Sequence, residues 1–153
     1  MPPTPRPANG PYVGVATFCE RVLRENDNVI SVMRVIDQLN VNASGEEVPD
    51  HLPPVPLNNV SLAIVLRRGE ARGRHRLRLR PEDPGGQQRD VAVDEFVQLG
   101  GDPESGANVV VDVSGFMVDQ EGLWWFDVLF GDSDQLIARI PLRVNYHPQR
   151  RMP

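Results

Sequence analysis

Proline and glycine interrupt this chain too often to leave room for long helices. Its 153 residues include 15 prolines and 13 glycines, which end or weaken a helix wherever they fall inside one. The intervening segments are short and rich in Val, Ile and aromatic residues, which favour strands. A chain of this length makes about one domain and can bury a core without a disulfide or metal. We therefore expect one domain built from many short strands.

Two segments near the C-terminal end alternate apolar and polar residues with the period of a strand. In Leu123–Phe130 and in Gln135–Tyr146 the even positions are apolar, and a turn at Gly131–Asp134 joins the segments. A hairpin must keep both apolar faces on the same side of the sheet, which restricts its register. The register that does so sets Asp127 opposite Arg139, a favourable pair of opposite charges.

Shorter apolar runs predict the remaining strands. They are Tyr12–Phe18, Val29–Val41, Val60–Leu66, Arg74–Arg80, Val91–Leu99 and Val109–Val118. Val29–Val41 also fits a helical period, but its many Val and Ile residues favour a strand. Thr17 and Glu20 have the spacing of a capping box, which predicts a short helical turn near residues 18–25. The fold expected is all-β, a single antiparallel two-sheet sandwich of immunoglobulin- or C2-like type.

The predicted domain spans residues 12–146. A Pro-rich segment at 1–11 and the segment 147–153 are expected to be flexible tails. Residues 42–59 contain four prolines and form either a linker between domains or a long loop. The piece before them is too short to build its own core, so we interpret them as a loop of a single domain.

The basic residues are unevenly placed. All 16 are arginine, and seven of them lie in residues 67–80 beside a single acid, Glu70. That segment therefore has a net charge of +6. Because the whole chain has a net charge of −5, the remaining residues carry −11. The overall negative charge argues against a protein that coats nucleic acid over its whole surface. The asymmetry makes this segment the first candidate site.

Four arginines of this segment share one face of the predicted strand. They are Arg74, Arg76, Arg78 and Arg80. Guanidinium groups spaced about 7 Å apart along one face of a strand suit phosphates or carboxylates. The strand could therefore bind an anion or nucleic acid. Alternatively it is a solvated face neutralised by acids such as Asp90, Asp94 or Glu95, and we favour this second interpretation.

Trp125 is the second candidate. It falls on the face opposite Trp124, near Arg139 and Arg143. An exposed Trp beside Arg is typical of protein–protein hot spots. The 42–59 loop or the helical turn could instead cover Trp125, and both possibilities stay open from the residues alone.

Nothing in the sequence indicates catalysis. The motifs of serine hydrolases, phosphate-binding loops, dinucleotide-binding folds and zinc proteases are absent, and the three histidines lie far apart. Cys19 fits a small buried hydrophobic residue better than a nucleophile. Asp132 and Asp134 suit a calcium loop, but a tight turn selects the same residues. We expect no catalytic residues, no metal site and no cofactor.

Both ends of the chain carry a family resemblance. The stretch from Ala16 to Asp37, with its short strand, its Cys19-Glu20 pair, a turn and an apolar run, resembles the opening of a family of small bacterial proteins of unknown function. Gly122–Phe130 followed by Ile140–Val144 is similar to that family's ending. The resemblance implies a cytoplasmic β-sandwich with no established activity and no catalytic residues.

The combined expectation is a non-catalytic protein-interaction or accessory module of the bacterial cytoplasm. It would bind another protein through the Trp125 face or an exposed edge strand. The alternative is anion or nucleic-acid binding through the strand 74–80. No apolar run is long enough to span a membrane, and the first residues lack the apolar region of a signal peptide, which favours the cytoplasm.

Overall fold

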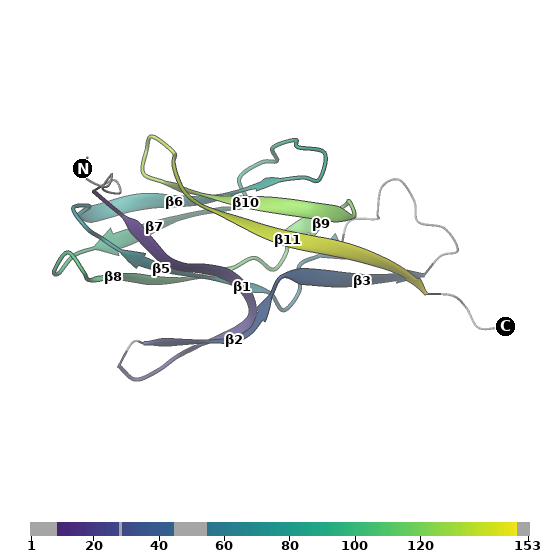
Figure 1. The fold of residues 1–153 in the computed structure, drawn as a ribbon, viewed down its shortest axis with the longest axis horizontal. Coiled ribbons are helices and arrows are strands. Elements are labelled where there is room, and N and C mark those ends of the chain that lie inside the picture. The colour runs from purple at the N-terminus through teal and green to yellow at the C-terminus, as the bar shows by residue number, and fades with distance from the viewer. Residues whose placement is uncertain (1–8, 28, 45–54, 150–153) are drawn as a thin grey trace, which may run out of the picture.

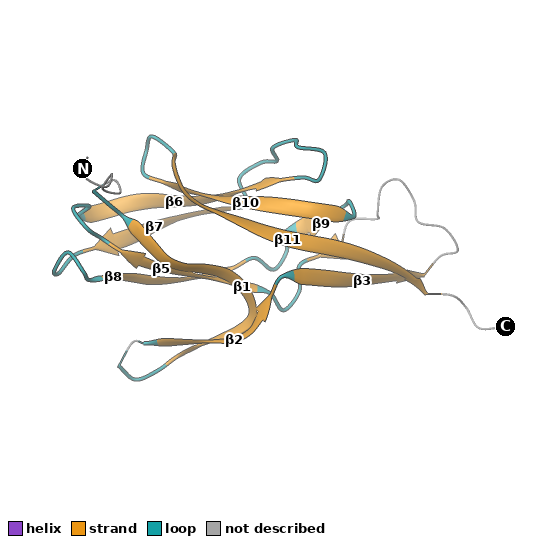
Figure 2. Cartoon of the chain, viewed as in Figure 1, coloured by secondary structure: helices purple, strands orange, loops and turns teal. Residues whose placement is uncertain are grey.

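The computed structural model describes residues 9–27, 29–44 and 55–149, drawn in colour in Figure 1. Every regular element among them is a strand (Figure 2), which confirms the all-β prediction. This part of the chain contains no helix long and apolar enough to cross a membrane. Of the predicted loop 42–59 and the predicted tails 1–11 and 147–153, residues 45–54, 1–8 and 150–153 lie outside the described residues. Residues 42–44, 55–56 and 147–149 belong to strands, which corrects the prediction of a loop and a tail there.

The strands form two main sheets and one small one. The four-stranded sheet has the order β2-β1-β5-β8, with β1 Tyr12–Arg24, β2 Ile30–Ile36, β5 Ser61–Arg67 and β8 Gly106–Asp112. The five-stranded sheet has the order β3-β11-β10-β6-β7, with β3 Gln38–Ser44, β6 Gly73–Glu82, β7 Val93–Leu99, β10 Gly122–Phe130 and β11 Gln135–Gln149. The short strands β4 (Val55–Pro56) and β9 (Met117–Val118) pair with each other.

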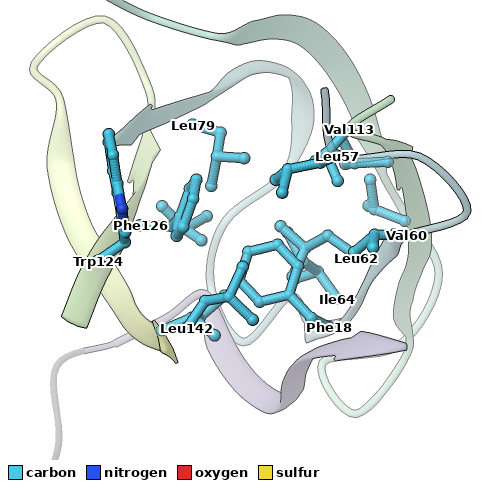
Figure 3. Close-up of a cluster of buried hydrophobic side chains, with 14 of the residues drawn as sticks. Phe18, Leu57, Val60, Leu62, Ile64, Leu79, Val113, Trp124, Phe126 and Leu142 are labelled. Carbon is cyan, nitrogen blue, oxygen red and sulfur yellow. The ribbon is translucent and has the colours of Figure 1, made fainter. Parts of the chain in front are cut away.

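One core lies between the two main sheets. Figure 3 shows the buried side chains that both sheets contribute to it. Phe18 of β1 meets Phe126 of β10 edge to face, with ring centroids 4.9 Å apart. The indole of Trp124 is fully buried, and its Nε1 donates to the carbonyl oxygen of Gln120 at 3.0 Å. The core therefore includes a large aromatic residue whose polar atom is satisfied.

The predicted register of the C-terminal hairpin is confirmed. Phe126 pairs with Ile140 and Asp127 with Arg139, as the alternation requires. The register shifts beyond Val128, where a bulge inserts one extra residue into β11. The inner and outer faces of β10 and β11 are therefore those that the sequence predicts over most of their length.

The predicted helical turn near residues 18–25 is wrong. Strand β1 pairs with β5 as far as Cys19 and continues to Arg24 because its second half pairs with β2. The Thr17 hydroxyl donates to the carbonyl oxygen of Phe18 at 3.2 Å and caps no helix. The pairing with β2 over Phe18–Arg24 outweighs a capping signal of about 1 kcal/mol.

Two further expectations need correction. The predicted strand Val29–Val41 is divided near Asp37 into β2 and β3, which belong to different sheets. The architecture is also not purely antiparallel, because β3 runs parallel to β11. The chain crosses from one sheet to the other between β2 and β3, which places β3 beside the last strand.

Gly106 allows β5 and β8 to approach each other. A Cβ at this position would lie 1.6 Å from the carbonyl oxygen of Leu66. We expect Gly106→Ala to lower the free energy of unfolding by about 3 kcal/mol, because the two backbones must separate. Gly100→Ala is the control, since no atom lies within 4 Å of its Cβ position. Urea unfolding of both variants checks this, and equal losses would contradict it.

Candidate functional site

The seven candidate binding residues from the sequence share one surface. The pairing of β6, β10 and β11 sets Asp127 between Arg80 and Arg139, and Trp125 between Glu82 and Pro141. Because alternate residues of a strand share a face, the candidate side chains lie together on the outer face of the five-stranded sheet. We call this surface the arginine–tryptophan face; its candidate residues are Arg74, Arg76, Arg78, Arg80, Trp125, Arg139 and Arg143.

The arginines of β6 each have a partner on a neighbouring element. The Nε of Arg76 donates to Asp94 of β7 at 2.8 Å, Arg78 donates to Asp134 in the hairpin turn, and Arg80 lies 3.7 Å from Asp127. Arg74 stacks on Phe96, with its guanidinium carbon 4.1 Å from the ring centroid. Three of the four arginines are thus paired with carboxylates.

Asp127 is the centre of this network. Its side chain is 6% exposed and accepts a hydrogen bond from the Nε of Arg139 at 2.9 Å. Arg139 also donates to Glu82, and its guanidinium carbon lies 4.9 Å from the ring centroid of Trp125. The hydrogen bond to Asp127 raises the pKa of Arg139 above its ordinary value. Arg139 is therefore held charged over one side of the Trp125 ring, which is half-buried.

The half of the face near β3 carries amides rather than carboxylates. The side-chain amide of Asn145 donates to Gln38 at 3.2 Å and to Asn40 at 3.4 Å. Arg143 is exposed beside them and forms no ion pair within the described part of the chain. Across the face, Arg74 and Arg143 are thus the arginines that have no carboxylate partner among the described residues.

Sequence reasoning finds the arginines and two of their partners, Asp127 and Asp94. Asp94 was among the acids expected to neutralise them, and the hydrogen bond from Arg76 lowers the pKa of its carboxyl. Asp90 and Glu95 form no ion pair with these arginines among the described residues. Asp134 was missed because it lies in a turn, and Glu82 because its contact with Arg139 spans two strands.

A second buried network lies near the connection between β6 and β7. Asp83 is 3% exposed and accepts hydrogen bonds from the Gln87 amide at 2.9 Å and from the Nε of Arg89 at 3.0 Å. Arg89 also donates to both carboxylate oxygens of Asp119 and stacks on Trp124. Burial by itself raises the pKa of Asp83, but the hydrogen bonds outweigh it and hold that pKa below its ordinary value.

Comparison with known protein families gives a match over nearly the whole described fold. The model of a family of unknown function, DUF6941, matches residues 14–145. None of the curated proteins compared with the chain matches it.

Carboxylates neutralise three of the four arginines of β6, which should limit polyanion binding by the arginine–tryptophan face. We expect Asp94→Asn to leave Arg76 without its anionic partner and to strengthen binding to heparin. Asp112→Asn is the control, because Asp112 is equally exposed, carries the same charge and lies on the other sheet. In a salt gradient, Asp94→Asn should elute from heparin after Asp112→Asn. If the two variants elute together, the total charge decides retention and Arg76 is not masked.

The Asp83 network predicts how stability depends on pH. Because folding lowers the pKa of Asp83, its contribution is fully present above the unfolded pKa of about 3.9 and is lost as the pH falls through the folded pKa. Asp83→Asn should therefore be less stable than the unmodified protein at neutral pH, and the difference should shrink on acidification. Urea unfolding across the acidic range measures it, and a difference independent of pH would contradict the assignment.

Proposed function

The chain belongs to DUF6941, a family without an assigned function, and we propose from its geometry that it is a non-catalytic protein-interaction module. The partner is another protein, which binds the arginine–tryptophan face. The observation that carries the proposal is Arg139, held over the ring of Trp125 by Asp127 and Glu82. We further propose that the module works in the bacterial cytoplasm and that its two sheets form an immunoglobulin- or C2-like sandwich.

Preorganised arginines and tryptophans are effective binding residues. Trp and Arg dominate protein–protein hot spots, and ordering a long side chain on binding costs about 0.5–1.5 kcal/mol. The two carboxylates already hold Arg139, so a partner need not order it. Leu123 and Pro141 flank Trp125 on the same face and supply apolar contact around it. This combination supports a protein surface as the ligand.

Anion or nucleic-acid binding through the strand 74–80 is the second candidate. It is favoured by the two arginines without carboxylate partners, Arg74 and Arg143. Phosphates would have to displace carboxylates from Arg76, Arg78 and Arg80, which costs binding free energy. Full engagement of four phosphates gives a slope of log K against log salt of about −3.6. We expect a much shallower slope for this face, which is why protein binding is the first candidate.

The chemistry of the titratable groups supports a non-catalytic role. Asp83 and Asp119 are bridged by Arg89, and Asp127 lies between two arginines. The hydrogen bonds to Asp83 outweigh its burial and hold its pKa below its ordinary value, which makes it a poor proton donor. Cys19 is fully buried, and burial raises the pKa of its thiol. A thiol that resists ionisation is a poor nucleophile.

Affinity purification from native bacterial lysate tests the proposal. We expect a protein partner that remains bound in high salt. Trp125→Ala should lose this partner, because the loss of a hot spot of about 2 kcal/mol lowers the affinity at least about thirtyfold. Met117→Ala is the matched control, because Met117 is 49% exposed but lies on β9, in the small sheet. It should leave the partner bound.

Two results would overturn this assignment. Nucleic acid that co-purifies in low salt and leaves in high salt, read from absorbance at 260 and 280 nm, would favour the anion-binding candidate. Equal retention of a partner by Trp125→Ala and Met117→Ala would remove Trp125 from the binding site.

A further inference from the structure

Strand β2 has the composition of an inner strand but lies at the edge of its sheet. Five of its seven residues are large and apolar, and none of the seven is buried. Strands that are apolar on both faces are normally covered on both faces. In the monomer, β2 therefore leaves apolar side chains exposed to solvent.

The exposed apolar residues lie along one hairpin. Val29 is 55% exposed, Met33 46% and Val35 66%. Among the described residues, β1 is the one element in extensive contact with β2, and the other edge of β2 pairs with no strand. In Figure 1, β2 lies at the lower edge of the view beside β1 and leads into β3 at one end. An apolar unpaired edge is a template for a further strand.

The usual protection against such pairing is weak here. Edge strands are commonly guarded by lysines, prolines or bulges, and β2 contains neither Lys nor Pro. Its one charged residue, Arg34, pairs with Glu20 of the same hairpin at 3.1 Å. Arg34 also has a φ of 53°, so the backbone departs there from the extended form. The part of the edge suited to pairing is thus centred before Arg34.

We propose that β2 pairs antiparallel with β2 of a second copy of this chain, with the twofold axis at Val32. This register pairs Val32 with Val32 of the second copy and sets Ser31 opposite Met33, within the extended part of the edge. At the ends of the contact, Ile30 lies opposite Arg34 and Val29 opposite Val35, so that the two most exposed apolar residues of the hairpin meet. An unguarded apolar edge pairs most readily with another apolar edge, and β2 of a second copy supplies one.

Charge also favours a second copy. The hairpin 19–36 carries three arginines and three acids, so it is neutral, whereas the chain has a net charge of −5. Two copies can therefore join at the hairpin with less repulsion than elsewhere on their surfaces. The twofold contact closes on itself and does not propagate into a fibre. A single strand pair is smaller than the roughly 1,200 Å² of stable interfaces, which predicts a dimer that dissociates on dilution.

Sedimentation equilibrium of the full chain over a wide range of concentrations tests the proposal. We expect a monomer–dimer equilibrium that Val35→Lys shifts at least about tenfold towards monomer, because it places a charge in the apolar contact. The control is Val110→Lys: Val110 is 37% exposed and lies on β8, the opposite edge of the same sheet. Equal thermal unfolding midpoints would show that both variants fold.

Disulfide trapping tests the register. Two copies of Val32→Cys should cross-link under oxidised glutathione, because residues on the axis face each other at a distance that a disulfide can span. The unmodified protein, whose cysteine is the buried Cys19, should not cross-link. A chain that stays monomeric at every concentration, a dimer that Val35→Lys leaves intact, or no cross-link at Val32→Cys would each overturn the proposal. Trp125→Ala should leave the dimer unchanged, so this result and that for the arginine–tryptophan face are independent.

Discussion

The alternation of inward and outward residues along β6, β10 and β11 is the constraint on which the candidate site depends. Burial of Leu77, Leu79, Phe126 and Leu142 leaves each strand only one way to face the core. The residues between them must then share the outer face. The arginines of β6 and the tryptophan of β10 are far apart in the sequence. They share a face because the apolar residues of all three strands point to the same core.

Ion pairs distinguish the arginine–tryptophan face from a row of unpaired basic side chains. Asp127 is buried between two arginines, and Asp94 and Asp134 hold two more. These pairs fix the guanidinium groups in place and reduce the positive charge they present to solvent. The result is an ordered surface of mixed charge with Trp125 at one side, which suits a protein better than a phosphate backbone.

Structure could be predicted from the sequence where a local pattern is compatible with one arrangement of the strands. The hairpin register followed from keeping two apolar faces on one side, and with it the pairing of Asp127 with Arg139. The prediction of a helical turn near residues 18–25 failed because Thr17 and Glu20 give a local signal that the pairing of β1 with β2 overrides. The parallel pairing of β3 with β11 joins distant segments, and nothing in either segment indicates it.

The same reasoning applies to the partners of the arginines. Asp94 could be proposed because it lies on a strand predicted near the arginine strand, whereas Asp134 and Glu82 depend on which strands become neighbours. The order β11-β10-β6-β7 places them beside Arg78 and Arg139. Side-chain contacts between strands distant in sequence therefore became visible only with the sheet order known.

The central claim is that the arginine–tryptophan face contacts another protein in the cell. The most direct measurement is photo-cross-linking in living bacteria, with a benzophenone amino acid placed at Trp125 in one strain and at Met117 in another. The account predicts a discrete protein adduct from position 125 that position 117 does not form. The same adducts from both positions, or cross-linking of position 125 to nucleic acid alone, would contradict it.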